Sequence, residues 1–377
     1  MKQDVLTGTS KLPSLTSYLN SRDIKRVLLV TGKSSFSNSS ARSLIEPHLQ
    51  EFEVSKFHDF SSNPKIEDLV RGIQVFRQDH CQALIAIGGG SVLDMAKLIK
   101  AYQASEANFE SDVVSNNVGA CNIPLIALPT TAGSGSEATQ FAVVYINNQK
   151  FSVSNELLLP NLVILVPKFT HSASSYLSAS TGMDAMTQSI ESFWSINSNE
   201  TSRGHSSEAM RILWKYLPLA VNSNDEKAKE KVMTAAHLAG KAINIAKTTA
   251  PHAISYSFTS FHGIPHGHAV ALTIPFFCGY NARITEEYCN DKRGADHVKA
   301  IISQLQEIFG EADLEQALNS FISKIGLDAT VPASPDGVEH DIDRILGNVN
   351  SQRMKNNPRA VQESDLRDML KQIILKN

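Results

Sequence analysis

Between residues 1 and 167, short apolar runs alternate with longer stretches whose apolar residues recur every three or four positions. Runs that are apolar throughout are typical of strands buried on both faces of a parallel sheet, and the stretches between them are typical of covering helices. This alternation indicates an α/β domain. The predicted strands are 26–31, 55–60, 83–87, 123–128 and 162–166, and the predicted helices are 66–80 and 92–104.

The pattern changes near Pro167, after which strand-like runs almost disappear. The stretches that follow carry apolar residues at helical spacing. The predicted helices are 173–194, 206–219, 226–247, 296–309, 314–325 and 364–375. The sequence therefore predicts two domains, an α/β domain over residues 1–167 and an all-helical domain over residues 168–377.

Composition excludes several classes of protein. Of the 377 residues, 42% are hydrophobic, which is ample material for a folded core. The formal net charge is −3, so binding of nucleic acid through bulk positive charge is not expected. Residues 1–15 lack the apolar core of a signal peptide, and no apolar run approaches the roughly 20 residues of a membrane span. With four scattered cysteines and no C-x-x-C pair, we expect a cytoplasmic protein without a membrane partner.

A run of three glycines, Gly88-Gly89-Gly90, links the predicted strand 83–87 to the helix that follows Ser91. Such a turn exposes backbone N–H groups at a helix N-terminus, where a pyrophosphate can approach without meeting side chains. The spacing fits neither G-x-G-x-x-G nor the P-loop pattern, so a tight turn without a ligand is the alternative.

A second polar loop, Pro129–Glu137, follows the next predicted strand. It supplies hydroxyl groups and small residues at the carboxyl edge of the sheet, where ligands of open α/β sheets bind. Alone, this loop is equally compatible with a simple hydrophilic turn. Together with the glycine run, it predicts the other side of a nucleotide cleft.

Histidines and an aspartate form a candidate metal set in the second half of the chain. Five of the twelve histidines lie between His237 and His268. On a helix, Asp184 and Gln188 share one face, and Asp184 with His252 and His266 would supply three nitrogen and oxygen ligands. The alternative is structural, with Asp184 as a helix cap and the histidines as satisfied polar groups.

The order of these motifs along the chain resembles the iron-containing, group III alcohol dehydrogenase family, and the resemblance covers nearly the whole sequence. It implies a Rossmann-like nucleotide-binding α/β domain followed by an all-helical metal domain, and a homodimer. The motifs are GGGSxxDxAK (Gly88–Lys97), PTTAGSGSE (Pro129–Glu137), TGMDA (Thr181–Ala185), HAISY (His252–Tyr256), GIPHGHAVA (Gly263–Ala271) and Asn357-Pro358-Arg359.

The resemblance also implies a metal ligand set, with one departure. In the family an Asp, a His four residues later and two further histidines hold the ion. Gln188 replaces the first histidine, and a neutral amide is a poorer ligand than imidazole. The implied ion is divalent, Fe²⁺ before Zn²⁺ or Ni²⁺. Tyr256 stands where many members carry another His near the nicotinamide, and nearby His262 is a candidate for proton relay. The implied ligands are Asp184, Gln188, His252 and His266.

For the cofactor, the resemblance implies NADP or NAD, with NADP favoured. Many NAD-dependent members have Thr-Asp-Lys after the first strand, where an acidic group would repel a 2′-phosphate. This chain has Gly32 there, and Lys33, Ser34 and Ser35 offer donors. The other implied contacts are Asn63, Gly89, Gly90, Ser91, Asp94, Thr130, Thr131, Ser134, Lys150 and Leu177.

The implied activity is metal-dependent interconversion of a primary alcohol and its aldehyde. The segment 252–272 looks most like the branch that reduces small phosphonate aldehydes. One alternative is a dehydroquinate-synthase-like lyase that uses NAD transiently, although HAISY and GIPHGH do not resemble that group. The other is a nucleotide-binding protein in which Gln188 marks a lost metal site.

Overall fold

The structure is a computed structural model that describes residues 3–33, 36, 39–105, 108–119, 121–147 and 149–375. The predicted cofactor donors Ser34 and Ser35 lie outside the described residues. The chain forms two compact units, residues 1–173 and residues 174–377.

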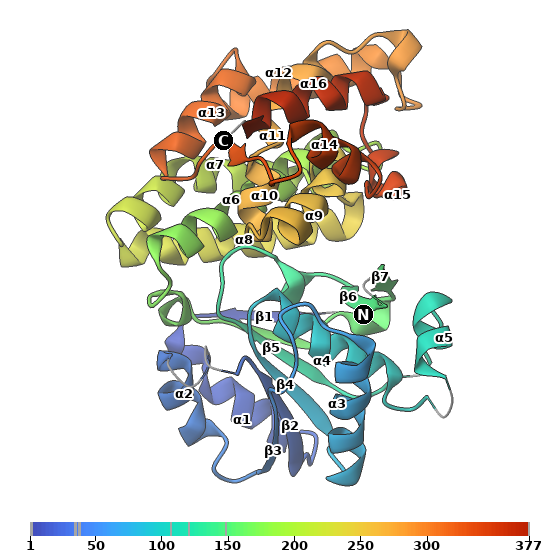
Figure 1. The fold of residues 1–377 in the computed structure, drawn as a ribbon. Helices are drawn as coiled ribbons and strands as arrows, with labels where there is room; N and C mark the ends of the chain where they lie inside the picture. Colours follow the sequence, from blue (N-terminus) through green and yellow to red (C-terminus); the bar gives the residue numbers. More distant parts are fainter. Residues whose placement is uncertain are drawn as a thin grey trace. The chain divides into compact units, whose positions relative to one another are not determined.

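The first unit contains a six-stranded parallel sheet in the order β1-β8-β5-β4-β2-β3 (Figure 1). In the register, Thr31 pairs with Ile87 and Gly88 pairs with Pro129, so the carboxyl ends of β2, β4 and β5 meet at one edge. The predicted parallel α/β sheet is therefore confirmed. The strands are β1 (Asp4–Thr7), β2 (Arg26–Thr31), β3 (Glu53–Phe57), β4 (Ala83–Gly88), β5 (Leu125–Pro129) and β8 (Leu162–Leu165).

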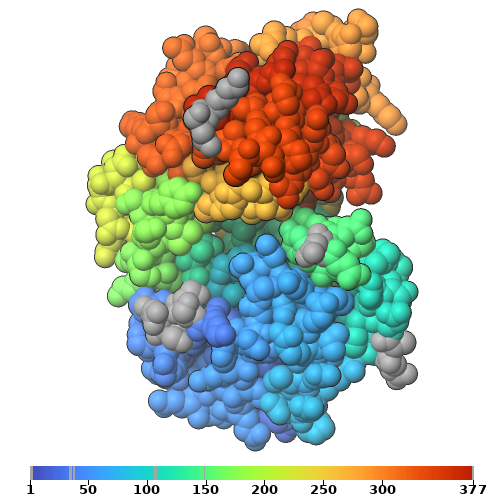
Figure 2. Space-filling model, viewed as in Figure 1, coloured from blue at the N-terminus to red at the C-terminus, as the bar shows by residue number. Residues whose placement is uncertain are grey.

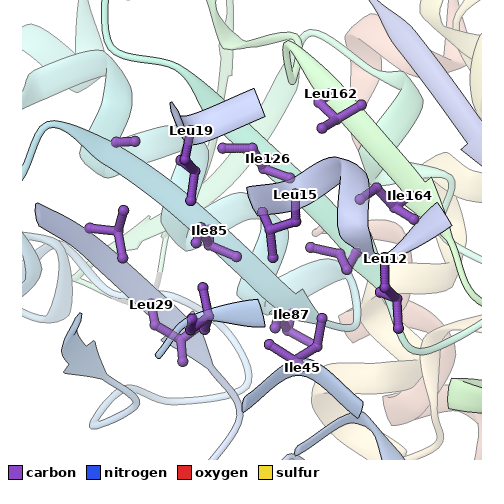
Figure 3. Close-up of a cluster of buried hydrophobic side chains, with 14 of the residues drawn as sticks. Leu12, Leu15, Leu19, Leu29, Ile45, Ile85, Ile87, Ile126, Leu162 and Ile164 are labelled. Atoms are coloured by element: carbon purple, nitrogen blue, oxygen red, sulfur yellow. The ribbon is translucent and has the colours of Figure 1, made fainter. Parts of the chain in front are cut away.

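Helices cover both faces of this sheet. Helices α1 (Pro13–Asn20) and α2 (Ser40–Ile45) lie on one face, and α3 (Ile66–Gln78) and α4 (Gly90–Tyr102) lie on the other (Figure 1). Leucines of α1 pack onto isoleucines of the central strands (Figure 3). On the other face, α3 forms part of the molecular surface, which is blue in Figure 2. Because both faces are covered, the central strands are apolar throughout. A short helix, α5 (Phe109–Val114), completes this unit.

The edge strands and a hairpin differ from the prediction. Strand β3 covers Glu53–Phe57 rather than 55–60, because its backbone pairing with β2 decides its bounds. Strand β1 was not predicted, since an edge strand with exposed side chains needs no apolar run. The antiparallel pair β6 (Phe141–Ile146) and β7 (Gln149–Ser154) was also missed; its alternating burial has the period of a strand.

The second unit is helical, as predicted, apart from one short pair of strands. The long helices after 174 match the predicted ones closely, except that α7 begins at Glu200 rather than 206. Helices α9, α10, α11, α14 and α15 were not predicted: Pro, Gly and apolar residues obscure the period of the first three, and the last two are short. None of the described helices has the length and apolar character of a membrane span. The elements are α6 (Ser175–Trp194), α7 (Glu200–Asn222), α8 (Glu226–Ala246), α9 (Ala250–His262), α10 (His266–Ala271), α11 (Ile274–Ala282), α12 (Ala295–Phe309), α13 (Leu314–Lys324), α14 (Val338–Leu346), α15 (Ser351–Met354), α16 (Glu363–Ile373), β9 (Val331–Pro332) and β10 (Ile374–Leu375).

Helix α6 is the buried centre of this unit, with α7, α8 and α10 packed around it. The GIPHGH segment returns the chain toward α6. Gly263, at φ +68°, ends α9 in the left-handed conformation that favours glycine. Gly267 then lies so close to α6 that an added Cβ would stand 2.0 Å from the Ser180 carbonyl oxygen. The absence of a side chain at Gly267 therefore allows α10 to approach α6.

We predict that Gly267→Ala destabilises the protein by roughly 1–3 kcal/mol, the usual cost of overpacking, because the clash is with backbone that cannot rotate away. Gly204→Ala is the matched control, since Gly204 is an exposed residue of α7 with open space around its Cβ position. Alanine favours a helix there, so this control should be neutral or slightly stabilising. Urea unfolding measures both variants, and equal stability of the two would contradict the packing argument.

Candidate functional site

Three of the predicted metal ligands converge in the second unit. Asp184 comes from α6, His252 from α9 and His266 from the start of α10, and one ligand atom of each lies within 4.8 Å of the others. Because bonds of about 2 Å place ligand atoms up to about 4 Å apart around an ion, small side-chain rotations would complete such a set. Asp184 and His252 are buried, and His266 is half-buried.

Gln188 lies one turn after Asp184 on α6, as the spacing predicts. Its side-chain amide nitrogen donates a hydrogen bond of 2.9 Å to Asp184 Oδ1. In this arrangement Gln188 holds the carboxylate of Asp184 in place. Asp184, His252 and His266 therefore converge, Gln188 lies beside them, and the assignment of Gln188 as a fourth ligand stays a prediction.

Glu191, which was not among the predicted site residues, adds a second carboxyl group to this cluster. It is fully buried on α6, and one carboxylate oxygen accepts from Nδ1 of His252. The other oxygen accepts from the backbone N–H of Thr249 at 2.9 Å, from its hydroxyl at 3.0 Å and from the backbone N–H of His252 at 3.2 Å. Glu191 therefore orients the His252 ring so that Nε2 faces Asp184 Oδ1 at 3.3 Å. A sequence signal existed, since an acidic residue seven positions after Asp184 falls on the same helix face.

The electrostatics of the cluster favour a cation. Burial alone would lower the pKa of His252, but the carboxylates of Glu191 and Asp184 outweigh burial and raise it to about 9. Burial also acts to raise the pKa of Asp184, and His252, His266 and Gln188 together lower it below its usual range. The carboxyl groups of Asp184 and Glu191 thus flank the His252 ring in one buried cluster, an arrangement that suits a divalent ion with oxygen and nitrogen ligands.

The two predicted catalytic residues have different surroundings. The Tyr256 ring stacks on the His266 ring, with centroids 5.1 Å apart and an angle of 6° between the planes. His262 is the last residue of α9, ten positions after His252 and hence about 15 Å farther along the helix axis. Its ring contacts Phe258, and it makes no contact with the ligand set in the described part of the chain. The structure thus brings Tyr256, but not His262, to the candidate metal residues.

In the first unit, the two predicted cofactor loops lie side by side. Thr130 donates its backbone N–H to the carbonyl oxygen of Gly88 at 3.0 Å. An added Cβ at Gly90 would stand 3.1 Å from the hydroxyl of Ser134, and one at Gly89 would stand 3.4 Å from Thr131. The N–H groups of Gly90 and Ser91 open α4 and have no intrahelical acceptor, so they suit an anion.

Some of the predicted cofactor-binding side chains form hydrogen bonds with other residues of the protein. The Ser91 hydroxyl donates to the carbonyl oxygen of Ser62, next to the exposed Asn63. Asp94 accepts from the Ser136 hydroxyl at 2.7 Å and from the backbone N–H of Val143 at 3.1 Å. Burial raises the pKa of Asp94, and the charges of Lys97 and Lys150 oppose this rise. Asp94 therefore joins the second loop to α4.

Lys97, also on α4, strengthens the same connection and was not predicted as a site residue. Its ammonium group is fully buried and donates to the Ser136 hydroxyl at 2.9 Å, to Thr139 Oγ1 at 3.0 Å and to the Phe141 carbonyl at 2.8 Å. Burial lowers the pKa of Lys97 to about 8, although Asp94 and Glu137 act to raise it.

Of the remaining predicted cofactor residues, Gly32 and Lys150 are half-buried and Leu177 is exposed. Gly32 follows β2 at the carboxyl edge of the sheet. The adjacent Lys33 forms an exposed ion pair with Asp59, with 3.9 Å between Nζ and Oδ1. Leu177 lies near the start of α6 in the second unit and is 40% exposed.

Both halves of the chain match models of one protein family. The model described as iron-containing alcohol dehydrogenase matches residues 2–167. The model described as Fe-containing alcohol dehydrogenase family, C-terminal, matches residues 178–374.

Individual relatives agree with this match. A long-chain-alcohol dehydrogenase of Geobacillus thermodenitrificans is 28% identical over 86% of this chain and 83% of its own. A phosphonoacetaldehyde reductase of Streptomyces viridochromogenes is 30% identical over 83% of this chain and 81% of its own. Among solved structures, a sulfoacetaldehyde reductase of Bifidobacterium kashiwanohense in complex with NAD⁺ aligns with a TM-score of 0.85 at 26% identity, covering 98% of this chain and 96% of that one. The chain therefore belongs to the iron-containing alcohol dehydrogenase family, whose members are oxidoreductases of alcohols and aldehydes.

Proposed function

We propose that the protein interconverts a small phosphonate-bearing aldehyde and its primary alcohol, using a nicotinamide dinucleotide and a divalent metal ion, with iron as the first candidate. The observation that carries this proposal is the convergence of Asp184, His252 and His266 within 4.8 Å. The similarity to a phosphonoacetaldehyde reductase and a sulfoacetaldehyde reductase supports the substrate class. In this proposal, residues 1–167 bind the dinucleotide and residues 168–377 bind the metal and the substrate.

In the proposed mechanism, Asp184, His252 and His266 hold the ion, and Glu191 keeps the His252 ring in its coordinating orientation. When bound, the ion supplies a Lewis acid for the carbonyl oxygen and the nicotinamide supplies the hydride. The N–H groups of Gly90 and Ser91 receive the diphosphate. Tyr256, stacked on His266, is the residue we propose to donate the proton to the alkoxide oxygen. His262 has no supporting contact for the proton relay proposed from the sequence.

We predict that NADPH is used at least as well as NADH, because Gly32 presents no carboxylate to a 2′-phosphate. Gly32→Asp should shift the preference toward NADH by about 1–3 kcal/mol, the scale of a charge-assisted hydrogen bond to the ribose. Steady-state kinetics with both cofactors measure the shift. Asp59→Asn is the companion variant: it removes the partner of Lys33 and should favour NADPH. A wild-type enzyme strongly selective for NADH would refute this prediction.

We predict that Gly90→Val abolishes dinucleotide binding while the helical content stays unchanged. The valine side chain would meet Ser134 and cover the N–H groups that open α4. Calorimetric titration with the cofactor measures binding, and circular dichroism reports the fold. Gly119→Val is the control, since its Cβ position in the same unit faces open space. Retained tight binding in Gly90→Val would mean that the glycine run is only a turn.

We predict that the wild-type protein binds a divalent ion but loses part of it to chelators, because Gln188 is no substitute for a fourth strong ligand. Gln188→His should tighten binding by adding an imidazole. His266→Ala should remove both metal and turnover, since only two strong ligands would remain.

Metal content and aldehyde reduction should be measured before and after dialysis against a chelator for the wild type and both variants. Wild-type activity that survives complete metal removal would overturn the Lewis-acid mechanism. In that case Tyr256 would be tested next as the acid that protonates the carbonyl oxygen.

A further inference from the structure

Arg353 lies beside the ring that stacks on the candidate ligand His266, and its charge acts on a second cation, Lys247. The guanidinium carbon of Arg353, in α15, is 5.1 Å from the centre of the Tyr256 ring. The same ring is 5.1 Å from the His266 ring. Arg353 is tied to the end of α8 by a hydrogen bond of 2.9 Å to the Thr248 hydroxyl, and Lys247 directly precedes Thr248. Figure 2 shows the α15 segment (red) at the surface of the second unit.

The backbone holds Lys247 in this place. Lys247 ends α8 with a backbone φ of +64°, a left-handed value that residues other than glycine rarely adopt. Strained backbone of this kind persists only where the surroundings enforce it, and it is concentrated at functional sites. Lys247 is therefore positioned by the end of the helix rather than placed at random on the surface.

The charges of Lys247 and Arg353 act against each other. Burial lowers the pKa of Lys247 to about 8, and the guanidinium charge of Arg353 lowers it further in the same direction. In the part of the chain that the structure describes, no carboxylate forms an ion pair with Arg353. Arg353 thus places half-buried positive charge near Lys247 without an acidic neighbour of its own, and a bound anion would offset the repulsion between the two groups.

We propose that Lys247 and Arg353 form a subsite for the oxyanion group of the substrate, with the aldehyde end directed to Asp184, His252 and His266. This inference rests on the proposed function and deepens it. A planar guanidinium binds tetrahedral oxyanions through two parallel hydrogen bonds, and an ammonium adds a point charge.

The dimensions suit a two-carbon substrate. With bond lengths of about 1.5 Å, its anionic oxygens lie roughly 4–5 Å from the aldehyde oxygen. Two distances of 5.1 Å join the His266 ring to the Tyr256 ring and the Tyr256 ring to Arg353, so Arg353 lies at most about 10 Å from the His266 ring. A metal bond of about 2 Å and a hydrogen bond of about 3 Å extend the reach of the bound molecule to roughly 9–10 Å, which is enough for it to reach Arg353 from the candidate metal residues. Tyr256 would then form the wall along which the substrate lies.

The kinetic test compares phosphonoacetaldehyde with propanal, an uncharged aldehyde, in the wild type, Arg353→Gln and Lys247→Met. We expect the preference for phosphonoacetaldehyde, as the ratio of the two kcat/KM values, to fall at least tenfold in each variant, mainly through KM. Arg353→Lys should recover part of it. Arg344→Gln is the control and should leave the ratio unchanged, because Arg344 makes a similar contact with Phe261, 3.9 Å from the ring centre, elsewhere along α9. Sulfoacetaldehyde as a third substrate distinguishes sulfonate from phosphonate.

A binding measurement separates this proposal from the proposed function. Ethylphosphonate has no aldehyde, so its calorimetric titration reports the oxyanion subsite without turnover. We expect binding to the wild type and to Arg344→Gln, and loss of binding in Arg353→Gln and Lys247→Met at unchanged melting temperature. An unchanged substrate ratio, or an equal effect of Arg344→Gln, would overturn the subsite while leaving aldehyde reduction intact. Binding of ethylphosphonate without reduction of any aldehyde would support the subsite and refute the proposed function.

Discussion

The carboxylates of Asp184 and Glu191 are buried on one face of α6, and the start of α9 is placed so that it satisfies them. An ionised carboxylate is costly to bury unless hydrogen bonds and opposite charges replace its water. Glu191 obtains these from Thr249 and His252, where α9 begins, and Asp184 obtains them from His252 and Gln188. The need to satisfy these two groups therefore constrains where α9 meets α6, and the same contacts orient the candidate ligand His252.

Close backbone packing brings the third candidate ligand, His266, to Asp184 and His252. Gly263 ends α9 with a positive φ, and Gly267 lets α10 pack against the backbone of α6 near Ser180. His266 lies between these two glycines in sequence, so its position beside His252 follows from the turn and the close approach together. The GIPHGH motif thus has a structural explanation in which the glycines matter as much as the histidines.

Buried charge has a comparable role in the first unit. Asp94 and Lys97 lie on α4, directly after the glycine run, and both bind Ser136 of the second polar loop and the segment that follows this loop. These contacts hold the loop against Gly90, where hydroxyl groups and helix N–H groups come together. Asp94 therefore stabilises the candidate nucleotide site through the loop, and the assignment of a direct cofactor contact to this residue stays a prediction.

The sequence by itself determined the class of the fold, because apolar runs and helical periodicity report burial directly, and the central strands and long helices needed no tertiary information. It also determined the candidate ligands Asp184, His252 and His266, since their residue types and motif order are specific. The sequence did not predict edge strand β1, because this strand is defined by its backbone pairing with β8 and not by an apolar pattern. Only the tertiary structure decided the role of Glu191 and Lys97, and the approach of Arg353 to Tyr256 across almost a hundred residues. The physical reason is that the partner of a side chain depends on how segments distant in sequence pack together, and a local sequence pattern carries no information about that packing.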